Sequence, residues 1–372
     1  MNKSLKFINH DKSQFLPVVK ERVDAYFKEN KLSKHANGFM IFKTVFFLSL
    51  SVILYLLIIA TSLPLYILLI AAILLGMTMA FIGFNVCHDA LHGAYSANKK
   101  VNQALGFVFN IIGANAYMWN ITHNIVHHSY TNIVDHDEDI EIAPGLIRVN
   151  ENDKINKLQR YQHIYAFFLY SLTTLSWFFR KDYLKFFKKD IGDSHINNHP
   201  KIEYFNLFFY KLIYYFLFIV LPLLVMDITW SQFLIGFLAM NLAEGLVLGL
   251  VFQLAHVVES TDIVQADEHN RLEDAWAVHQ LKTTANFAPT NKLASFLCGG
   301  LNMQVEHHLF PRVCHIHYRK ISEIVKNTAA EFNLPYHVNH SFFSALRSHY
   351  LFLKKLGRPV SAPVSLSEPL KA

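Results

Sequence analysis

The chain has 372 residues, of which 52% are hydrophobic and 17% are charged, and its mean hydropathy is +0.23. Soluble chains carry about 25% charged residues, so this composition excludes a disordered chain and argues against an ordinary soluble domain. In so apolar a chain, a net charge of +6 points to the cytoplasmic face of a membrane protein rather than to nucleic acid. Composition alone does not account for the 21 histidines.

The first 39 residues are polar and basic, and we expect them to form a cytoplasmic N-terminal segment. A membrane domain is expected over residues 40–356, followed by a loose tail over 357–372. Within this domain four apolar segments are long enough to cross a bilayer, which takes about 20 helical residues. They cover residues 41–60, 65–86, 205–226 and 232–255. The short connections at 61–64 and 227–231 predict two helical hairpins. The first connection contains Pro64, a residue that stops a helix.

The basic residues predict how these hairpins are oriented. Neither short connection contains a Lys or an Arg, whereas both terminal segments and the long middle segment contain many. By the positive-inside rule, the two termini and the middle segment are expected in the cytoplasm.

Two further apolar stretches, 104–117 and 161–179, complicate this topology. The first is short and interrupted by Gly and Asn, and the second is rich in Phe and ends in Arg180-Lys181. We interpret both as interfacial or re-entrant helices rather than as additional crossings.

Eight histidines gather in four places, and the others are scattered. The eight are His88, His92, His123, His127, His128, His256, His307 and His308. Residues four apart share a helix face, so His88/His92 and His123/His127 are each predicted to offer two ligands to an ion. Neutral imidazole suits iron, zinc, copper and nickel, and so many histidines predict more than one ion.

The topology and the histidines support each other. Four crossings place every cluster on the cytoplasmic face, whereas six would separate the cluster at residues 123–128 from the rest. A channel or transporter would instead distribute its histidines through the depth of the bilayer.

Three motifs resemble the histidine boxes of membrane fatty acid desaturases, and the resemblance extends over about residues 80–340. They are His88-Asp89-Ala90-Leu91-His92, Trp119-Asn120-Ile121-Thr122-His123-Asn124-Ile125-Val126-His127-His128 and Gln304-Val305-Glu306-His307-His308-Leu309-Phe310-Pro311. Gln304, with Cys298-Gly299-Gly300-Leu301-Asn302 before it, resembles the front-end branch, which inserts a double bond between an existing one and the carboxyl end.

The resemblance implies an all-α integral membrane fold, with a cytoplasmic helical cap that holds a di-iron centre. All eight clustered histidines would be catalytic ligands, and dioxygen would be the co-substrate. Gln304 stands where related enzymes have His, so direct, water-mediated and indirect roles toward the metal all stay open. Asp89, Asn124 and Glu306 are polar neighbours that could orient ligands or be solvated.

The resemblance also implies partners. A fatty acyl group on CoA or a lipid would be the substrate, membrane lipids would surround the protein, and nucleic acid would play no part. Fused cytochrome b5 domains carry His-Pro-Gly-Gly, whereas His199-Pro200 here lacks the glycines. We therefore expect a separate electron donor, such as ferredoxin or cytochrome b5 with its reductase, and a bacterial inner membrane location.

Two rival functions use similar residues. A fatty acid or sphingolipid hydroxylase shares the histidine boxes, and a membrane zinc hydrolase would need His-Glu-x-x-His, where this chain has Asp89 after His88. The acidic run 135–141 is interpreted as a solvated loop or as support for ligands. Basic residues at 99–100 and 180–189 are interpreted as contacts with anionic lipid, a donor protein or acyl-CoA. Cys87 and Cys298 are expected to be free buried thiols.

Overall fold

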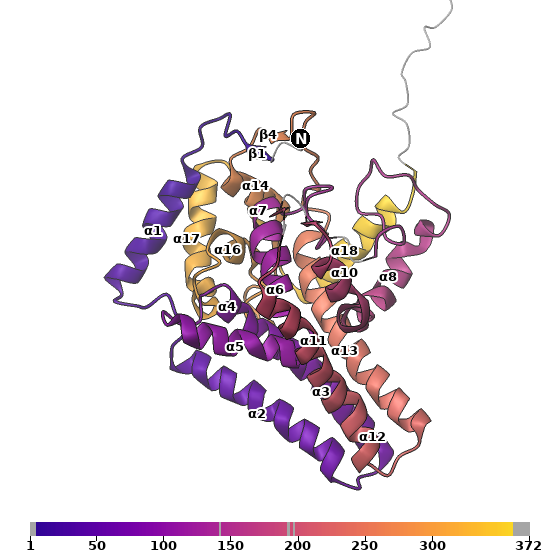
Figure 1. Cartoon of the computed structure of the whole chain (residues 1–372). Helices are drawn as coiled ribbons and strands as arrows, with labels where there is room; N and C mark the ends of the chain where they lie inside the picture. The colour runs from indigo at the N-terminus through magenta and orange to yellow at the C-terminus, as the bar shows by residue number, and fades with distance from the viewer. Residues whose placement is uncertain (1–4, 141–142, 192–193, 196–197, 360–372) are drawn as a thin grey trace, which may run out of the picture.

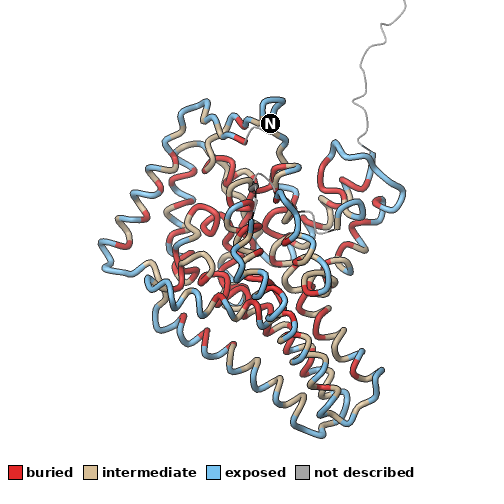
Figure 2. Tube along the Cα trace, in the orientation of Figure 1, coloured by how far each residue is buried: buried red, intermediate tan, exposed pale blue. Residues whose placement is uncertain are grey.

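The computed structural model describes residues 5–140, 143–191, 194–195 and 198–359. Long helices form an elongated bundle at one end, and shorter helices with small two-stranded sheets form the other end (Figure 1). Buried segments concentrate in the middle of the molecule, where the two parts meet (Figure 2).

Within these residues the α-helices are α1 (Phe15–Glu29), α2 (Gly38–Ala60), α3 (Leu65–Ile82), α4 (His88–Leu91), α5 (Lys99–Ile111), α6 (Ala116–Trp119), α7 (His128–Tyr130), α8 (Gln162–Ser171), α9 (Thr173–Ser176), α10 (Asp182–Phe186), α11 (Lys201–Tyr215), α12 (Leu221–Val225), α13 (Trp230–His256), α14 (Trp276–Thr283), α15 (Lys292–Leu297), α16 (Gln304–Leu309), α17 (Tyr318–Glu331) and α18 (Phe342–Leu356). The π-helical segments are η1 (Gly83–Cys87), η2 (Asn120–His127), η4 (Trp177–Lys181) and η5 (Phe216–Val220), and the 3-10 turns are η3 (Gln159–Tyr161) and η6 (His315–His317). The strand pairs are β1 (Lys6–Phe7) parallel to β4 (Arg271–Leu272), β2 (Asp190–Ile191) antiparallel to β3 (Ser194–His195), and β5 (Ala285–Phe287) parallel to β6 (His337–Asn339).

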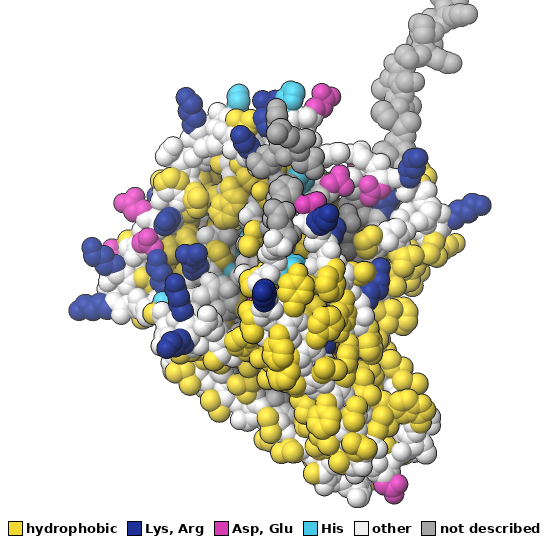
Figure 3. Space-filling view, viewed as in Figure 1, with side chains coloured by type: hydrophobic (Ala, Val, Ile, Leu, Met, Phe, Trp, Pro, Cys, Tyr) yellow, Lys and Arg dark blue, Asp and Glu magenta, His cyan; other side chains and the backbone are white. Residues whose placement is uncertain are grey.

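Four continuous helices in the described residues are long and apolar enough to cross a bilayer, with mean hydropathies of 2.0 to 2.6. They are Gly38–Ala60, Leu65–Leu91, Lys201–Val225 and Trp230–His256. The predicted all-α membrane fold with two hairpins is therefore confirmed. Apolar side chains cover the elongated bundle, and charged ones gather at the other end (Figure 3).

The second of these helices is longer than the predicted 65–86. No proline or loop residue stops it, and the π-helical turn η1 carries α3 directly into α4. His88 was expected just beyond the crossing, and it instead lies on the crossing helix itself.

α3 and α13 form the closest pair of long helices. A Cβ atom on Gly76 of α3 would lie 2.0 Å from the carbonyl oxygen of Met240 in α13, so only glycine permits this approach. The capping box of Thr229 and Gln232 fixes the start of α13. α3 continues through η1 into α4, which begins at His88, and α13 ends at His256, so their packing helps to set the positions of two histidines.

The two interrupted apolar stretches fold as broken helices. Residues 104–117 divide between α5 and α6, and the break contains Gly113, whose φ of +103° and contact with the Tyr214 ring exclude a side chain. Residues 161–179 fold as η3, α8, α9 and the start of η4. Neither stretch belongs to the four candidate crossings, while their depth in a bilayer stays a prediction.

The N-terminal segment packs onto α16, the helix that carries His307 and His308. Phe15 and Val19 of α1 share a hydrophobic core with Val305 and Leu309 of α16. The predicted segment 1–39 is thus packed against the rest of the molecule over its described part, from residue 5. Most of the predicted loose tail, residues 360–372, lies outside the described residues.

Candidate metal centre

Four separate stretches of the chain bring the eight clustered histidines together. His88 and His92 come from the end of the second long helix, and His256 is the last residue of α13. His123, His127 and His128 come from η2 and α7, and His307 and His308 from α16. Seven of the eight are buried, and His92 is partly exposed.

The ring nitrogens of these histidines form groups in which all ligand atoms lie within 4.8 Å of one another. One group holds His88, His92, His123 and His307, and a second holds His127, His256 and His308. His128 forms a third group with His307 and His308, and so lies between the other two. The structure therefore brings all eight predicted histidine ligands together, seven of them in two groups that His128 links.

The predicted pairing of His123 with His127 needs correction. These residues are four apart, but they belong to different groups. They lie on η2, where π-helical hydrogen bonds widen the turn, so residues four apart no longer point at one ion position. His88 and His92 do fall in one group, with ring centroids 4.6 Å apart.

A shared feature of the eight side chains tests whether they fit metal ions. In every one, the buried Nε2 atom has no hydrogen-bond partner among the described residues. Buried polar atoms without partners are costly and rare, and eight within one cluster are not accidental. Imidazole nitrogens are ligands for divalent transition metals, so the chemistry of these residues fits metal ions.

The opposite ring nitrogens of four of the eight histidines are held by hydrogen bonds. His127 Nδ1 lies 2.8 Å from Asp137 Oδ2, and His308 Nδ1 lies 2.8 Å from Gln280 Oε1. His307 Nδ1 lies 3.2 Å from the Tyr318 hydroxyl. The Nδ1 of His256 lies 3.3 Å from the backbone oxygen of Thr283. Such contacts orient a histidine and leave Nε2 free for a metal.

Burial keeps several of these rings uncharged. Burial, followed by the neighbouring imidazoles, lowers the pKa values of His92, His128, His307 and His308 well below the usual range. Burial lowers the pKa of His123 to about 3, although Asp139 opposes the shift. Neutral imidazole is the form that binds a metal.

Gln304 lies on α16, three and four residues before His307 and His308. Its side chain is 3% exposed, and its Oε1 atom is buried without a partner. It lines a cavity together with His88 and His123. The structure thus places Gln304 beside the histidine groups, with an oxygen available to a ligand.

The three predicted supporting residues have different roles. Asp89 Oδ2 accepts hydrogen bonds from the ring and backbone of His315, and its Oδ1 lies 3.8 Å from His88 Nδ1. Asn124 donates to the backbone oxygen of Leu91.

Glu306 accepts hydrogen bonds from Asn286 and Tyr336. Among the described residues, neither Asn124 nor Glu306 bonds to a histidine ring. The contacts that these two side chains make are with backbone and neighbouring elements, and an orienting role toward the ligands stays a prediction.

Sequence reasoning included Asp137 and Asp139 as possible support for ligands, but it missed Gln280 and Tyr318. Asp137 and Asp139 lie in the acidic run that was interpreted as loop or support, and Glu141 lies outside the described residues. Lys185, 3.5 Å from Asp139, and His123 keep the pKa of Asp139 below its usual value, although burial alone would raise it. Gln280 belongs to α14, whose sequence suggested no chemical role. The only indication in the sequence was that Gln280 is a polar residue in a short helix.

Several remaining histidines form structural hydrogen bonds. His279 Nε2 lies 2.7 Å from the backbone oxygen of Thr131, and His349 bridges the Tyr170 hydroxyl and the Val257 backbone oxygen. Cys87 and Cys298 are free and buried, as expected.

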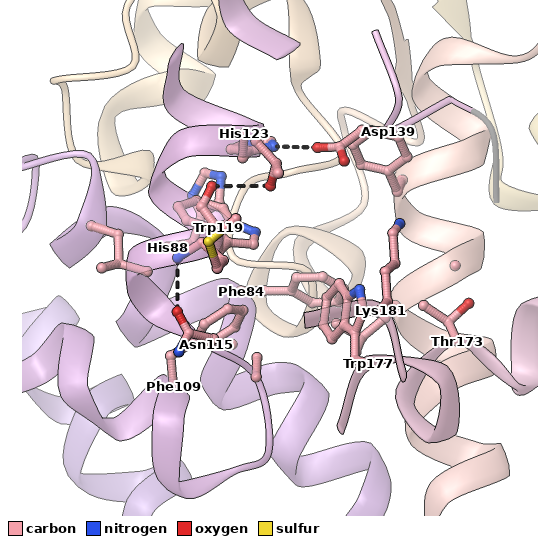
Figure 4. A pocket seen from close by; sticks show the side chains of 18 of the residues that line it. Phe84, His88, Phe109, Asn115, Trp119, His123, Asp139, Thr173, Trp177 and Lys181 are labelled. Carbon is pink, nitrogen blue, oxygen red and sulfur yellow. Dashed lines mark hydrogen bonds and ion pairs between the residues drawn. The ribbon is translucent and has the colours of Figure 1, made fainter. Parts of the chain in front are cut away.

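An apolar cavity of about 130 Å³ borders the first histidine group. Phe84, Phe109 and Trp177 line it opposite His88 and His123. Its charged end is formed by Asp139, Lys181 and Lys185, and Figure 4 shows Asp139 between His123 and Lys181. A long apolar molecule with one polar end would match this wall.

Comparisons with known proteins agree with this geometry. The profile of the family described as "Fatty acid desaturase" matches residues 36–340. The sn-1 linoleoyl-lipid 6-desaturase of Synechocystis sp. is 35% identical over 93% of this chain and 96% of its own. The Acyl-lipid (8-3)-desaturase of Physcomitrium patens is 35% identical over 95% of this chain and 74% of its own. The Probable Delta(5) fatty acid desaturase C of Dictyostelium discoideum is 31% identical over 93% of this chain and 77% of its own.

Proposed function

Because the chain belongs to the fatty acid desaturase family and is an enzyme that introduces a double bond into a fatty acyl chain, we propose that it is a front-end desaturase with a di-iron centre. One observation carries the metal part of this proposal. The Nε2 atoms of all eight histidines are buried and have no hydrogen-bond partner among the described residues, and they lie beside an apolar cavity.

The ligand assignment follows the two groups. His88, His92, His123 and His307 would hold one iron ion, and His127, His256 and His308 the other, with His128 between them. Gln304 would contribute its oxygen at the cavity wall, directly or through water. Iron held there supplies the capacity to reduce dioxygen and to oxidise an unactivated methylene group.

The protein itself orients the ligands and the substrate. Asp137, Gln280 and Tyr318 hold three rings by their Nδ1 atoms. The oxygens of Asp137 and Gln280 accept from Nδ1 and so keep the Nε2 atoms of His127 and His308 free of protons. Phe84, Phe109 and Trp177 exclude water and hold the acyl chain against the wall formed by His88 and His123. Fixing the chain in this way selects which pair of carbons reacts.

The front-end assignment is supported by the position of the charged end of the cavity. Asp139 Oδ2 lies 3.7 Å from His123 Nδ1, and Lys185 lies 3.5 Å from the other carboxylate oxygen. If the ester end of a lipid-linked acyl chain lies at these charges, its carboxyl-side carbons lie closest to the histidines. The relatives named as 6-desaturase and Delta(5) desaturase act close to the carboxyl end, in keeping with this orientation.

The proposal includes the membrane topology and the electron source. With the Lys/Arg-free connections outside, both termini and the histidine centre face the cytoplasm of a bacterial inner membrane. Each turnover consumes one dioxygen, two electrons and two protons, and yields one double bond and two waters. A separate ferredoxin or cytochrome b5 with its reductase would deliver the electrons.

Expression in a host that lacks polyunsaturated lipids tests the reaction. Supplied with a monoenoic or dienoic acid, membranes with the wild-type chain should form a product lighter by two hydrogens, which mass spectrometry detects. A product heavier by one oxygen would indicate a hydroxylase instead. Active protein with about one zinc ion and no iron would contradict the di-iron centre.

A further inference from the structure

Glu244 lies near the middle of α13, inside a candidate membrane crossing. Glu244, Leu248 and Phe252 are spaced four apart, so they share one face of this helix. Phe252 contacts His127, with ring centroids 5.0 Å apart. Eight residues of α-helix separate Glu244 from Phe252, which places its backbone about 12 Å from the histidine centre along the helix axis.

This carboxyl group has no hydrogen-bond partner among the described residues. Glu244 is 3% exposed, and its Oε2 atom is buried and unpaired. The polar groups nearby are bonded to one another. The Tyr214 hydroxyl donates to Asn241 Oδ1 at 3.0 Å, and the Thr174 hydroxyl donates to the Asn241 backbone oxygen at 2.8 Å.

An unpaired carboxyl group at this depth needs an explanation. An ionised carboxylate buried alone is far more costly than the neutral acid, so the group is expected to carry an O–H donor. Ionisable residues inside a membrane segment generally mark functional sites. The O–H group expected on Glu244 therefore has no acceptor among the described residues.

The cavities indicate where that partner would come from. Glu244 lines a small void of about 10 Å³ together with Met79, Ile112 and Thr174. Gly83, Phe109, Ala114, Trp177 and Leu248 line both this void and the larger cavity beside the histidines. The void therefore adjoins the larger cavity at these shared residues, and by itself it has room for about one water. An acyl chain in the larger cavity would reach Glu244 by displacing the shared side chains.

We propose that the Glu244 carboxyl group recognises a double bond already present in the acyl chain, an inference that rests on the proposed desaturase function. Beyond its carbonyl group, an unmodified acyl chain contains only methylene, methyl and C=C groups. Of these, only the π electrons of C=C accept a hydrogen bond, in a weak O–H···π contact. A saturated chain leaves the donor unpaired.

The position of Glu244 agrees with the order of groups along such a substrate. Thr173, Trp177, Lys181 and Lys185 follow one another at intervals of four and line the larger cavity. Lys181 and Lys185 form the charged end of this series, and Lys185 lies beside Asp139. Thr173, at the other end, is next to Thr174, which lines the void of Glu244. A chain with its ester at the lysines presents its more distant carbons, including an existing double bond, to Glu244.

Competition between substrates tests this inference. Full-length protein in membranes, with its iron and electron donor, is given phosphatidylcholines whose acyl chains have one length and are saturated, monoenoic or dienoic. Glu244→Leu should lower the preference for unsaturated over saturated chains by about two- to fivefold. Glu244→Gln keeps an N–H donor of similar size and should retain most of that preference.

Thr78→Val is the matched control, because Thr78 is a buried polar residue of α3 whose hydroxyl bonds to the Leu74 backbone oxygen and which lines neither cavity. It should leave the preference unchanged. An unchanged preference in Glu244→Leu, or an equal loss in Glu244→Gln, would overturn the inference alone. Failure of the wild-type chain to desaturate any substrate would overturn the proposed function and this inference with it.

Discussion

The two histidine groups differ in how firmly the protein holds them. In the group of His127, His256 and His308, all three side chains are 0% exposed, and every Nδ1 has a hydrogen-bond partner within 3.3 Å. In the other group, His307 Nδ1 has a partner at 3.2 Å, but His88 Nδ1 is 3.8 Å from Asp89 and His123 Nδ1 is 3.7 Å from Asp139. Of the eight histidines, only His88 and His123 line the apolar cavity.

The difference separates an anchored group from a substrate-facing one. Rings fixed by short hydrogen bonds present their Nε2 atoms in one orientation, which favours tight binding of an ion. Rings with looser contacts beside a cavity can adjust when a chain enters. We therefore expect changes in the anchored group to act on metal retention, and changes at the cavity to act on substrate use.

The largest effect is expected from removing an anchored ligand. His127→Ala or His308→Ala should reduce desaturation below detection while the chain still inserts into membranes, because each removes a ring nitrogen from the second group. Product profiling and membrane extraction measure the two properties. Retained turnover in either variant would show that the ligand assignment is wrong.

A smaller effect is expected from the carboxylate that holds an anchored ligand. Asp137→Asn should weaken iron binding by about 10- to 100-fold, since Asp137 lies 2.8 Å from His127 Nδ1. Iron content after graded chelation measures this. Asp139→Asn is the matched variant and should lose less iron, because its contact with His123 is 3.7 Å long. Equal losses in both would remove the distinction between the groups.

The charged end of the cavity predicts a dependence on pH. Burial first, and then Lys185, lowers the pKa of Lys181 to about 8. Lys181 is therefore cationic below this pH and neutral above it, so the KM for a lipid substrate should rise by about two- to fivefold as the pH passes 8. Lys181→Arg should flatten the profile, because Arg keeps its charge. An unchanged profile in Lys181→Arg would exclude Lys181 from substrate binding.

The smallest effect is expected at Gln304. Gln304→His replaces the unpaired Oε1 by a ring nitrogen, which is also a metal ligand, so the fold-change in turnover and in iron content should be smaller than that for Asp137→Asn. Initial rates and iron content measure the change. If neither the initial rate nor the iron content changes, Gln304 has no role beside the metal.

The fold and the clustering of the eight histidines were largely predictable, because both rest on patterns local to the sequence. Apolar segments of about 20 residues predict crossing helices, and histidines in clusters predict ligands. The supporting residues were not predictable in this way. Gln280 reaches His308 from 28 residues away, and Tyr318 reaches His307 from another helix. Such contacts depend on how α14, α16 and α17 pack, which no local pattern encodes.

The sequence also did not predict that His123 and His127 belong to different histidine groups. A spacing of four predicts a shared face only if the helix is α-helical. Nothing in Asn120–His127 distinguishes a π-helical turn from an α-helical one by composition, and packing of Trp119 and Phe252 around the rings accompanies the wider turn. The helix type, rather than the motif, decides which group each histidine joins.

The second and fourth long helices pass from the apolar bundle straight into His88 and His256, with no loop in between. A bilayer that thickens or thins changes the tilt of helices that span it. Because these helices are rigid, a change of tilt is transmitted mechanically to the two histidines, which belong to different groups. We therefore expect the distance between the two histidine groups to depend on the thickness of the membrane around the protein.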